Sequence, residues 1–133
     1  MWSPQYYYLN IYHDAELSVH YNTKELIDFL KTLPELNQTG NFTFSNSFQF
    51  PTSINLTLLF ARHLNSWNDN DTDQQRTNLI AIVCKKDTSQ NFDKLKSIFI
   101  KIAKFVNWKL EDEHTDDGIE NHTIWSPNKN DYR

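Results

Sequence analysis

The sequence predicts an α+β fold, a two-layer sandwich in which two helices pack on a mainly antiparallel sheet of four to five strands. Two segments repeat apolar residues at the three- and four-residue spacing of a helix. Four others alternate apolar and polar residues or form short apolar runs, as strands do. Their order is strand, helix, three strands and helix, and the stretch 107–112 allows a last short strand. The 133 residues are enough to bury one hydrophobic core, so we expect a single domain over residues 1–133.

The first strand is expected at residues 6–13, "YYYLNIYH", where aromatic and β-branched residues are concentrated. A helix is expected over 22–33. Asn22 is typical of a helix N-cap, Glu25 stands three positions later, and leucine and isoleucine then recur at helical spacing. Pro34 should end this helix, because proline lacks a backbone donor and disfavours helical conformation in the residue before it.

Three strands are expected next. In the stretch 42–50, "FTFSNSFQF", phenylalanines alternate with polar residues, which predicts a strand with one apolar and one solvated face. The stretch 54–62, "INLTLLFAR", repeats the alternation. Residues 77–86, "TNLIAIVCKK", are apolar on both faces, so we expect a central strand that is covered on both sides. The single cysteine, Cys84, lies in this run and is expected to be buried and unreactive.

A second helix is expected over 91–106, where a broad apolar stripe faces one way and lysines face the other. From about residue 111 the sequence becomes polar and acidic. We expect a C-terminal tail there, which Ile119, Ile124 and Trp125 would hold against the domain.

Composition excludes several classes of function. The chain has only two glycines, which argues against the glycine-rich phosphate loops of nucleotide-binding proteins. No apolar stretch approaches the ~20 residues that a membrane-spanning helix needs, and no secretory signal is recognised. A single cysteine fits a reducing compartment. We therefore expect a cytoplasmic protein that binds no membrane.

The net charge is −4, and acidic residues concentrate in two stretches. The first is "SWNDNDTDQQRTN" at 66–78, and the second is "EDEHTDDGIE" at 111–120. Together they predict an anionic face, which repels nucleic acid and favours a basic protein partner. The alternative is a solvated acidic segment that only keeps the protein in solution. The candidate partner-binding residues are Trp67, Asp69, Asp71, Asp73, Glu111, Asp112, Glu113, Asp116, Asp117 and Glu120.

A calcium loop of the EF-hand type is excluded by the first stretch itself. Counted from Asp69, oxygen ligands stand at positions 1, 3 and 5, but Gln74 replaces the required glycine and Ile80 the required glutamate. The second stretch holds residues of metal-ligating types, a grouping that is common by chance in a polar segment: His114, Asp116, Asp117, Glu120 and His122. We therefore expect no metal and no cofactor.

In these two acidic stretches and in overall character, the chain resembles the small immunity proteins of bacterial toxin systems, such as contact-dependent inhibition. The resemblance implies a non-enzymatic domain that binds and occludes a cognate toxin, commonly a nuclease with a basic active site. It implies no role for any individual residue.

Two other classes of function stay open on the sequence. A small-molecule-binding regulatory module would need an apolar pocket lined by Phe42, Phe44 and Phe48. A small nuclease-type enzyme would need two histidines in one cleft. The five candidates for such a pair are His13, His20, His63, His114 and His122.

Overall fold

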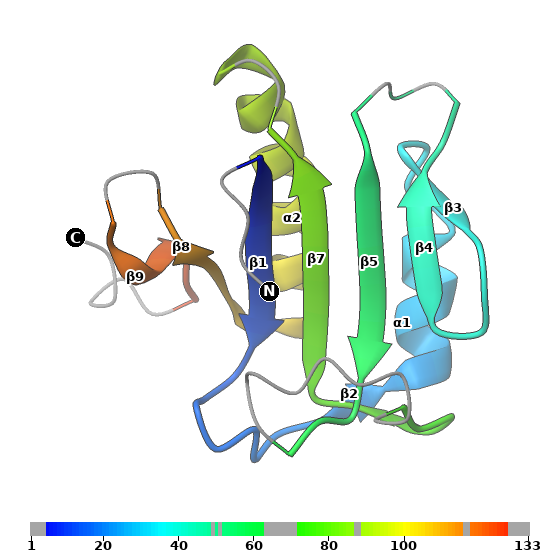
Figure 1. Ribbon diagram of the computed structural model, residues 1–133. Helices are drawn as coiled ribbons and strands as arrows, with labels where there is room; N and C mark the ends of the chain where they lie inside the picture. Colours follow the sequence, from blue (N-terminus) through cyan, green and yellow to red (C-terminus); the bar gives the residue numbers. More distant parts are fainter. Residues whose placement is uncertain are drawn as a thin grey trace.

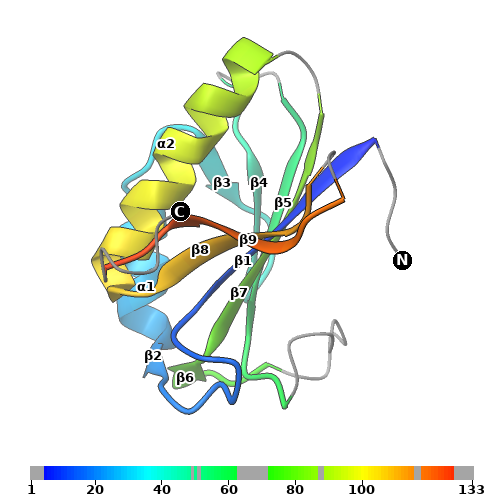
Figure 2. The ribbon, with the colours of Figure 1, turned by 90° about the vertical axis from the view of Figure 1, so that its left-hand side faces the viewer.

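Two helices cover one face of a seven-stranded sheet in the computed structural model (Figures 1 and 2), which describes residues 5–48, 50, 52–62, 72–86, 89–115 and 118–127. The predicted α+β class, with two helices and an antiparallel sheet, is confirmed. The predicted number of four to five strands is wrong, because two edge strands extend the main sheet to seven.

Five strands of the main sheet fall where the sequence predicts them, and all of their pairings are antiparallel. They are β1 (Tyr6–Tyr12), β4 (Thr43–Asn46), β5 (Ile54–Leu59), β7 (Leu79–Lys85) and β8 (Lys109–His114).

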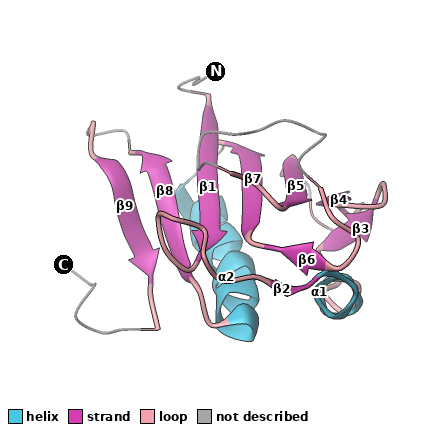
Figure 3. Cartoon of the chain, turned by 90° about the horizontal axis from the view of Figure 1, so that it is seen from below, coloured by secondary structure: helices cyan, strands magenta, loops and turns pink. Residues whose placement is uncertain are grey.

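The edges of the sheet are β3 (Leu36–Gln38) and β9 (Glu120–Trp125), which gives the order β3-β4-β5-β7-β1-β8-β9. A separate two-stranded sheet joins β2 (Tyr21–Asn22) to β6 (Arg76–Thr77) beside the first helix (Figure 3). These additional strands are short or polar, so none of them carries the apolar alternation from which a strand is predicted.

The first helix, α1, spans Thr23–Leu30. Asn22 is its N-cap as predicted, since the Asn22 side chain accepts the backbone N–H of Glu25 at 2.9 Å. The helix ends three residues before the predicted end at Leu33. Backbone bonds from Thr32 to Phe29 and from Leu33 to Leu30 tighten the chain into turns ahead of Pro34.

The second helix, α2, spans Ser89–Val106, and its apolar stripe is buried against the sheet as predicted. Asn107 ends it at φ 62°, while the backbone N–H of Trp108 reaches back to the carbonyl of Ala103 at 3.0 Å. This is the left-handed helix end that asparagine tolerates better than most residues. Among the described residues, no helix is long and apolar enough to cross a bilayer.

The main core lies between the helices and one face of the sheet. The rings of Phe29 and Phe105 stack at 4.0 Å between their centroids and join the two helices. A smaller apolar cluster covers part of the opposite face, so the central strand β7 is covered on both sides for much of its length, as predicted. The members of this cluster are Tyr12, Leu17, Leu59, Ala61, Leu79 and Ala81.

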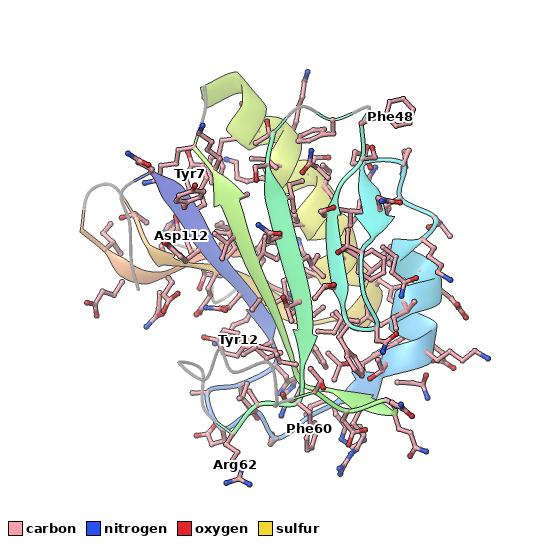
Figure 4. All side chains as sticks on the ribbon, turned by 45° about the vertical axis from the view of Figure 1, so that its right-hand side comes forward. Tyr7, Tyr12, Phe48, Phe60, Arg62 and Asp112 are labelled. Carbon is pink, nitrogen blue, oxygen red and sulfur yellow. The ribbon has the colours of Figure 1, made fainter. Side chains whose placement is uncertain are left out.

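The phenylalanine-rich stretch is shorter as a strand than its alternation predicts. The strand ends at Asn46, where the backbone N–H of Phe50 turns back to the carbonyl of Ser47 at 3.0 Å. Phe44 and Phe50 are buried, but the turn directs Phe48 into solvent, where its side chain is 95 % exposed (Figure 4). The prediction that all four phenylalanines share one apolar face is therefore wrong for Phe48.

Cys84 is buried on β7, as predicted. Burial, together with the nearby charge of Asp112, raises the pKa of its thiol to about 12. At pH 8 the thiolate fraction is then about three orders of magnitude below that of an ordinary cysteine. We expect Ellman's reagent to label the native protein at least about a hundredfold more slowly than the denatured chain. Equal rates in the two states would contradict the burial of Cys84.

Candidate partner-binding surface

The acidic segment at 111–120 begins as a strand, and is therefore not the polar tail that the sequence predicts. β8 and β9 form an antiparallel hairpin, and β8 also pairs with β1, which joins the hairpin to the main sheet. A register shift between Leu110 and Glu111 marks a bulge in the hairpin. The acidic residues therefore alternate between the two faces of a sheet and differ strongly in their exposure.

Glu111 is 6 % exposed and takes part in a polar network on the face of the sheet away from the helices. Tyr12 on β1 donates its hydroxyl proton to Glu111 Oε1. Thr123 on β9 donates to Oε2 at 3.3 Å, and the ammonium of Lys109 lies 3.5 Å from the same oxygen. The Lys109 ammonium also lies 4.8 Å from the centre of the Tyr12 ring. Burial and the bond to Glu111 raise the pKa of Tyr12 far above its usual value. Glu111 thus connects three strands.

Asp112 faces the other way, toward the helices, because it pairs with Leu9 of the main core. Asp112, which is labelled in Figure 4, is only 5 % exposed. The next residue, Glu113, is half-buried, and burial raises the pKa of its carboxyl group. Neither Glu111 nor Asp112 can therefore offer its carboxylate to a partner as an exposed acidic residue would.

The tip of the hairpin does present exposed side chains. The backbone N–H of Thr115 bonds the carbonyl of Ile119 at 2.9 Å, and the N–H of Ile119 bonds the Thr115 hydroxyl at 3.0 Å. Gly118 takes φ 85°, a left-handed conformation that suits glycine. Ile119 is 50 % exposed, so it does not hold a tail against the domain as the sequence predicts. The adjacent Glu120 is exposed as well.

The two later apolar residues of the hairpin do pack on the domain. Ile124 and Trp125 lie against the main core, and the ammonium of Lys104 lies 6.0 Å from the Trp125 ring. The prediction for these two residues is confirmed. The hairpin is therefore attached to the domain along β8 and the end of β9, while Ile119 and Glu120 stand at its exposed tip.

Asp73 has a structural part in the chain before β6. Its carboxylate accepts the backbone N–H groups of Gln75 at 2.8 Å and Arg76 at 3.0 Å, and pairs with the Arg76 guanidinium at 3.1 Å. These bonds hold the pKa of Asp73 below its usual value. The Arg76 guanidinium in turn lies 4.2 Å from the centre of the Phe60 ring. Asp73 therefore fixes a turn, whatever it contributes to a partner surface.

Asp73 and the described acidic residues of the hairpin lie toward opposite ends of the sheet. β8 runs antiparallel to β1 from Tyr12 toward its beginning, so the hairpin tip lies near the start of β1. Asp73 precedes β6, which leads into the start of β7 beside the end of β1 (Figure 1). The described acidic residues thus do not join into one face. The remaining predicted partner-binding residues lie outside the described part of the chain: Trp67, Asp69, Asp71, Asp116 and Asp117.

The contacts that hold the β8–β9 hairpin could be predicted only in part from the sequence. Lys109 and Tyr12 are far apart in the chain, so their shared contact with Glu111 depends on the pairing of β1 with β8. The dipeptide Asp117-Gly118 does carry a local signal, because Asp-Gly is typical of a turn between two paired strands.

Other kinds of site find less support in the described residues. His13 hydrogen-bonds Asp14, His20 meets the Phe60 ring edge-on, and His122 pairs with Asp112 across the β8–β9 ladder. No group of three or more His, Cys, Asp or Glu that could hold a metal occurs within the part of the chain that the structure describes. The pocket that a small-molecule-binding module would need between Phe42, Phe44 and Phe48 does not form, because Phe44 fills the core and Phe48 points outward (Figure 4).

Comparison with known proteins gives no relative. No protein-family model, no curated protein and no solved structure matches this chain significantly. The function must therefore be inferred from the residues and their arrangement alone.

Proposed function

We propose that the chain is a non-enzymatic protein-binding domain, an immunity protein that binds a cognate bacterial toxin in the cytoplasm and occludes its basic active site. The observation that carries this proposal is the tip of the β8–β9 hairpin, where the half-exposed side chain of Ile119 stands beside exposed Glu120. Both residues belong to one of the acidic stretches on which the resemblance to immunity proteins rests.

An apolar side chain among carboxylates suits a protein interface. Complete burial of an isoleucine side chain contributes about 1.5–3 kcal/mol. A half-exposed isoleucine can still gain part of this free energy when a partner covers it. Acidic neighbours attract a basic partner over several ångströms and raise the rate of productive encounter. Ile119 would therefore supply affinity, and Glu120 would steer association.

The buried carboxylates of the same stretch serve the tip indirectly. Glu111 joins β8 to β1 and β9, and Asp112 is enclosed on the helix side. The bonds of Glu111 hold the base of the hairpin on the sheet, so less conformational freedom would be lost when the tip meets a partner. Trp67, Asp69 and Asp71, which lie outside the described residues, remain predicted contacts of the partner.

The experiment that tests this proposal begins with capture of the partner from lysate of the source organism at low salt. Association and dissociation rates of that partner are then measured for hairpin variants. We expect Glu120→Lys to slow association about tenfold at low ionic strength, with a smaller effect at high salt. We expect Ile119→Ala to raise the dissociation constant roughly tenfold, mainly through faster dissociation.

The matched control is Glu16→Lys, which makes the same change of charge at an exposed position in the loop after β1. It should leave both rates close to those of the unmodified protein. Equal slowing by the two charge reversals would mean that net charge alone matters, and unchanged binding in both hairpin variants would exclude the tip as the contact. Failure to retain any basic protein from a lysate that contains the toxin would contradict the function itself.

A further inference from the structure

A pocket of about 320 Å³ opens between α2 and the segment that joins α1 to β3. Phe50 and Ile98 form its apolar floor, and Pro34 adds a further apolar wall. This volume lies at the lower end of the range for small-molecule sites. The pocket is separate from the β8–β9 hairpin, so a ligand bound in it would not depend on the proposed toxin binding.

The wall of this pocket is fixed by hydrogen bonds. The hydroxyl of Ser47 donates to the carbonyl of Pro34 at 2.7 Å, and the backbone N–H of Ser47 donates to the carbonyl of Glu35 at 2.8 Å. The turn after β4, which positions Phe50, is thereby tied to the start of β3. Such a wall exists before a ligand arrives, which lowers the cost of binding.

Charged groups of both signs line the same pocket. Lys94 and Lys101, two helical turns apart on α2, are exposed at its rim, and Glu35 lies in its wall. Glu35 Oε1 is shielded from solvent and accepts no hydrogen bond. No ion pair within 4 Å joins Glu35 to either lysine in the described part of the chain. A carboxylate oxygen that is shielded from water and has no donor in the protein lacks a hydrogen bond. An N–H group of a ligand would supply it. Because the terminal torsion of glutamate is broad, either oxygen can turn toward such a donor.

We propose that this pocket binds a free α-amino acid with an aromatic or large aliphatic side chain. Its ammonium group would donate to Glu35, its carboxylate would lie between Lys94 and Lys101, and its side chain would lie on Phe50 and Ile98. The three kinds of surface in the pocket thus match the three parts of one small molecule. Charge-assisted hydrogen bonds of this kind also fix the orientation of the ligand.

The same charges disfavour the other anionic ligands that lysines often bind. A phosphate or a nucleic-acid backbone would place its charge close to the Glu35 carboxylate and would offer it no N–H donor. An apolar floor gives a phosphate no favourable contact either. Glu35 is therefore the residue that sets the class of ligand.

The test is a titration of the ¹⁵N-labelled protein with L-phenylalanine, N-acetyl-L-phenylalanine and L-phenylalanine amide, followed by amide chemical shifts. We expect saturable shifts around Glu35, Ser97 and Ile98 with a dissociation constant of about 1 mM for phenylalanine, given its small number of atoms. The N-acetyl compound lacks the ammonium and the amide lacks the carboxylate. Each should bind about tenfold more weakly.

Two variants test which charged residues of the pocket bind the ammonium and which bind the carboxylate of the ligand. Glu35→Gln should weaken the binding of phenylalanine about tenfold and leave the affinity for the N-acetyl compound unchanged. The double variant Lys94→Ala, Lys101→Ala should weaken the binding of phenylalanine but not that of its amide. Lys24→Ala, which removes an exposed lysine from α1, is the control and should change neither. The spectra also report whether each variant is folded.

No saturable shift at these residues would overturn the proposal, as would shifts confined to another surface. Equal affinity for the amide would assign the pocket to the N-terminal residue of a peptide, and equal affinity for the N-acetyl compound to a C-terminal one. Either result would overturn the proposal that the pocket recognises both charged ends of a free amino acid. Retained toxin binding alongside any of these results would leave the immunity function standing.

Discussion

Replacing Phe44 by alanine is expected to lower the free energy of unfolding by about 3–5 kcal/mol. Phe44 is 1 % exposed, pairs with Leu56 across the β4–β5 ladder and belongs to the main core. Alanine would remove the ring and leave a cavity that the paired strands can close only in part. Urea denaturation followed by circular dichroism measures the change directly, provided that the slope of the transition stays constant.

The same sequence stretch supplies the control. Phe48→Ala makes the identical chemical change four residues later, at a side chain that lies almost wholly in solvent. It should change the free energy of unfolding by no more than about 0.5 kcal/mol. Comparable losses in the two variants would mean that both rings face the core, as the alternation of the sequence alone suggests, and would contradict the exposure of Phe48.

This pair of phenylalanines shows where reasoning from the sequence ends. A period of two is read correctly at Phe44, because β4 does alternate there. In the sequence, phenylalanine and polar residues continue to alternate as far as Phe50, but the strand stops at Asn46. The Asn46 side chain accepts the N–H of Ile54 and donates to the carbonyl of Phe50. Those two bonds depend on how the chain returns into β5. The local sequence pattern therefore cannot predict these two hydrogen bonds.

The helices could be predicted more fully, since their signals are local. Asn22 and Glu25 mark the start of α1 within four residues, and the stripe of α2 repeats over several turns. The central strands were equally clear, because burial on both faces leaves a continuous apolar run in β7. The edge strands were not, because β3 has three residues and β9 begins with exposed polar ones. Their pairing partners, not their composition, make them strands.

The candidate site was predictable in location but not in the roles of its residues. Composition drew attention to 111–120, yet it gave every carboxylate in that stretch the same weight. Pairing with β1 buries Glu111 and Asp112 on opposite faces and leaves Glu120 exposed. Partners such as Tyr12, 99 positions away in the chain, decide which acidic residues stabilise the fold. Only the sheet topology brings them together.

Removing the Glu111 side chain is accordingly expected to destabilise the protein strongly. In Glu111→Ala the Tyr12 hydroxyl loses its acceptor and the Lys109 ammonium loses its counter-charge, at a site that is almost fully enclosed. Breaking a buried polar network from one side leaves its other members unsatisfied, so we expect a loss of about 2–4 kcal/mol in the free energy of unfolding. Urea denaturation is again the measurement.

Glu120→Ala is the matched control, since it removes the same side chain from the same hairpin at an exposed position. It should leave the free energy of unfolding within about 0.5 kcal/mol of the unmodified protein. In toxin binding the order should be reversed, with Glu120 more important than Glu111. Glu120 variants should slow association, whereas Glu111→Ala should act only through the fraction of unfolded protein. Stability losses of similar size at both positions would show that β8 is not enclosed as described.

A double-mutant cycle separates the network from simple loss of packing. Tyr12→Phe removes only the hydroxyl group and should cost about 1–2 kcal/mol, because Glu111 keeps Thr123 and Lys109 as partners. Once Glu111 is alanine, the Tyr12 hydroxyl has no acceptor left in this network, so its removal should cost little or become favourable. The combined variant should therefore lose at least about 1 kcal/mol less than the sum of the single losses. Strict additivity would mean that Tyr12 and Glu111 stabilise the sheet independently, and the hairpin tip would then owe its position to β-pairing alone.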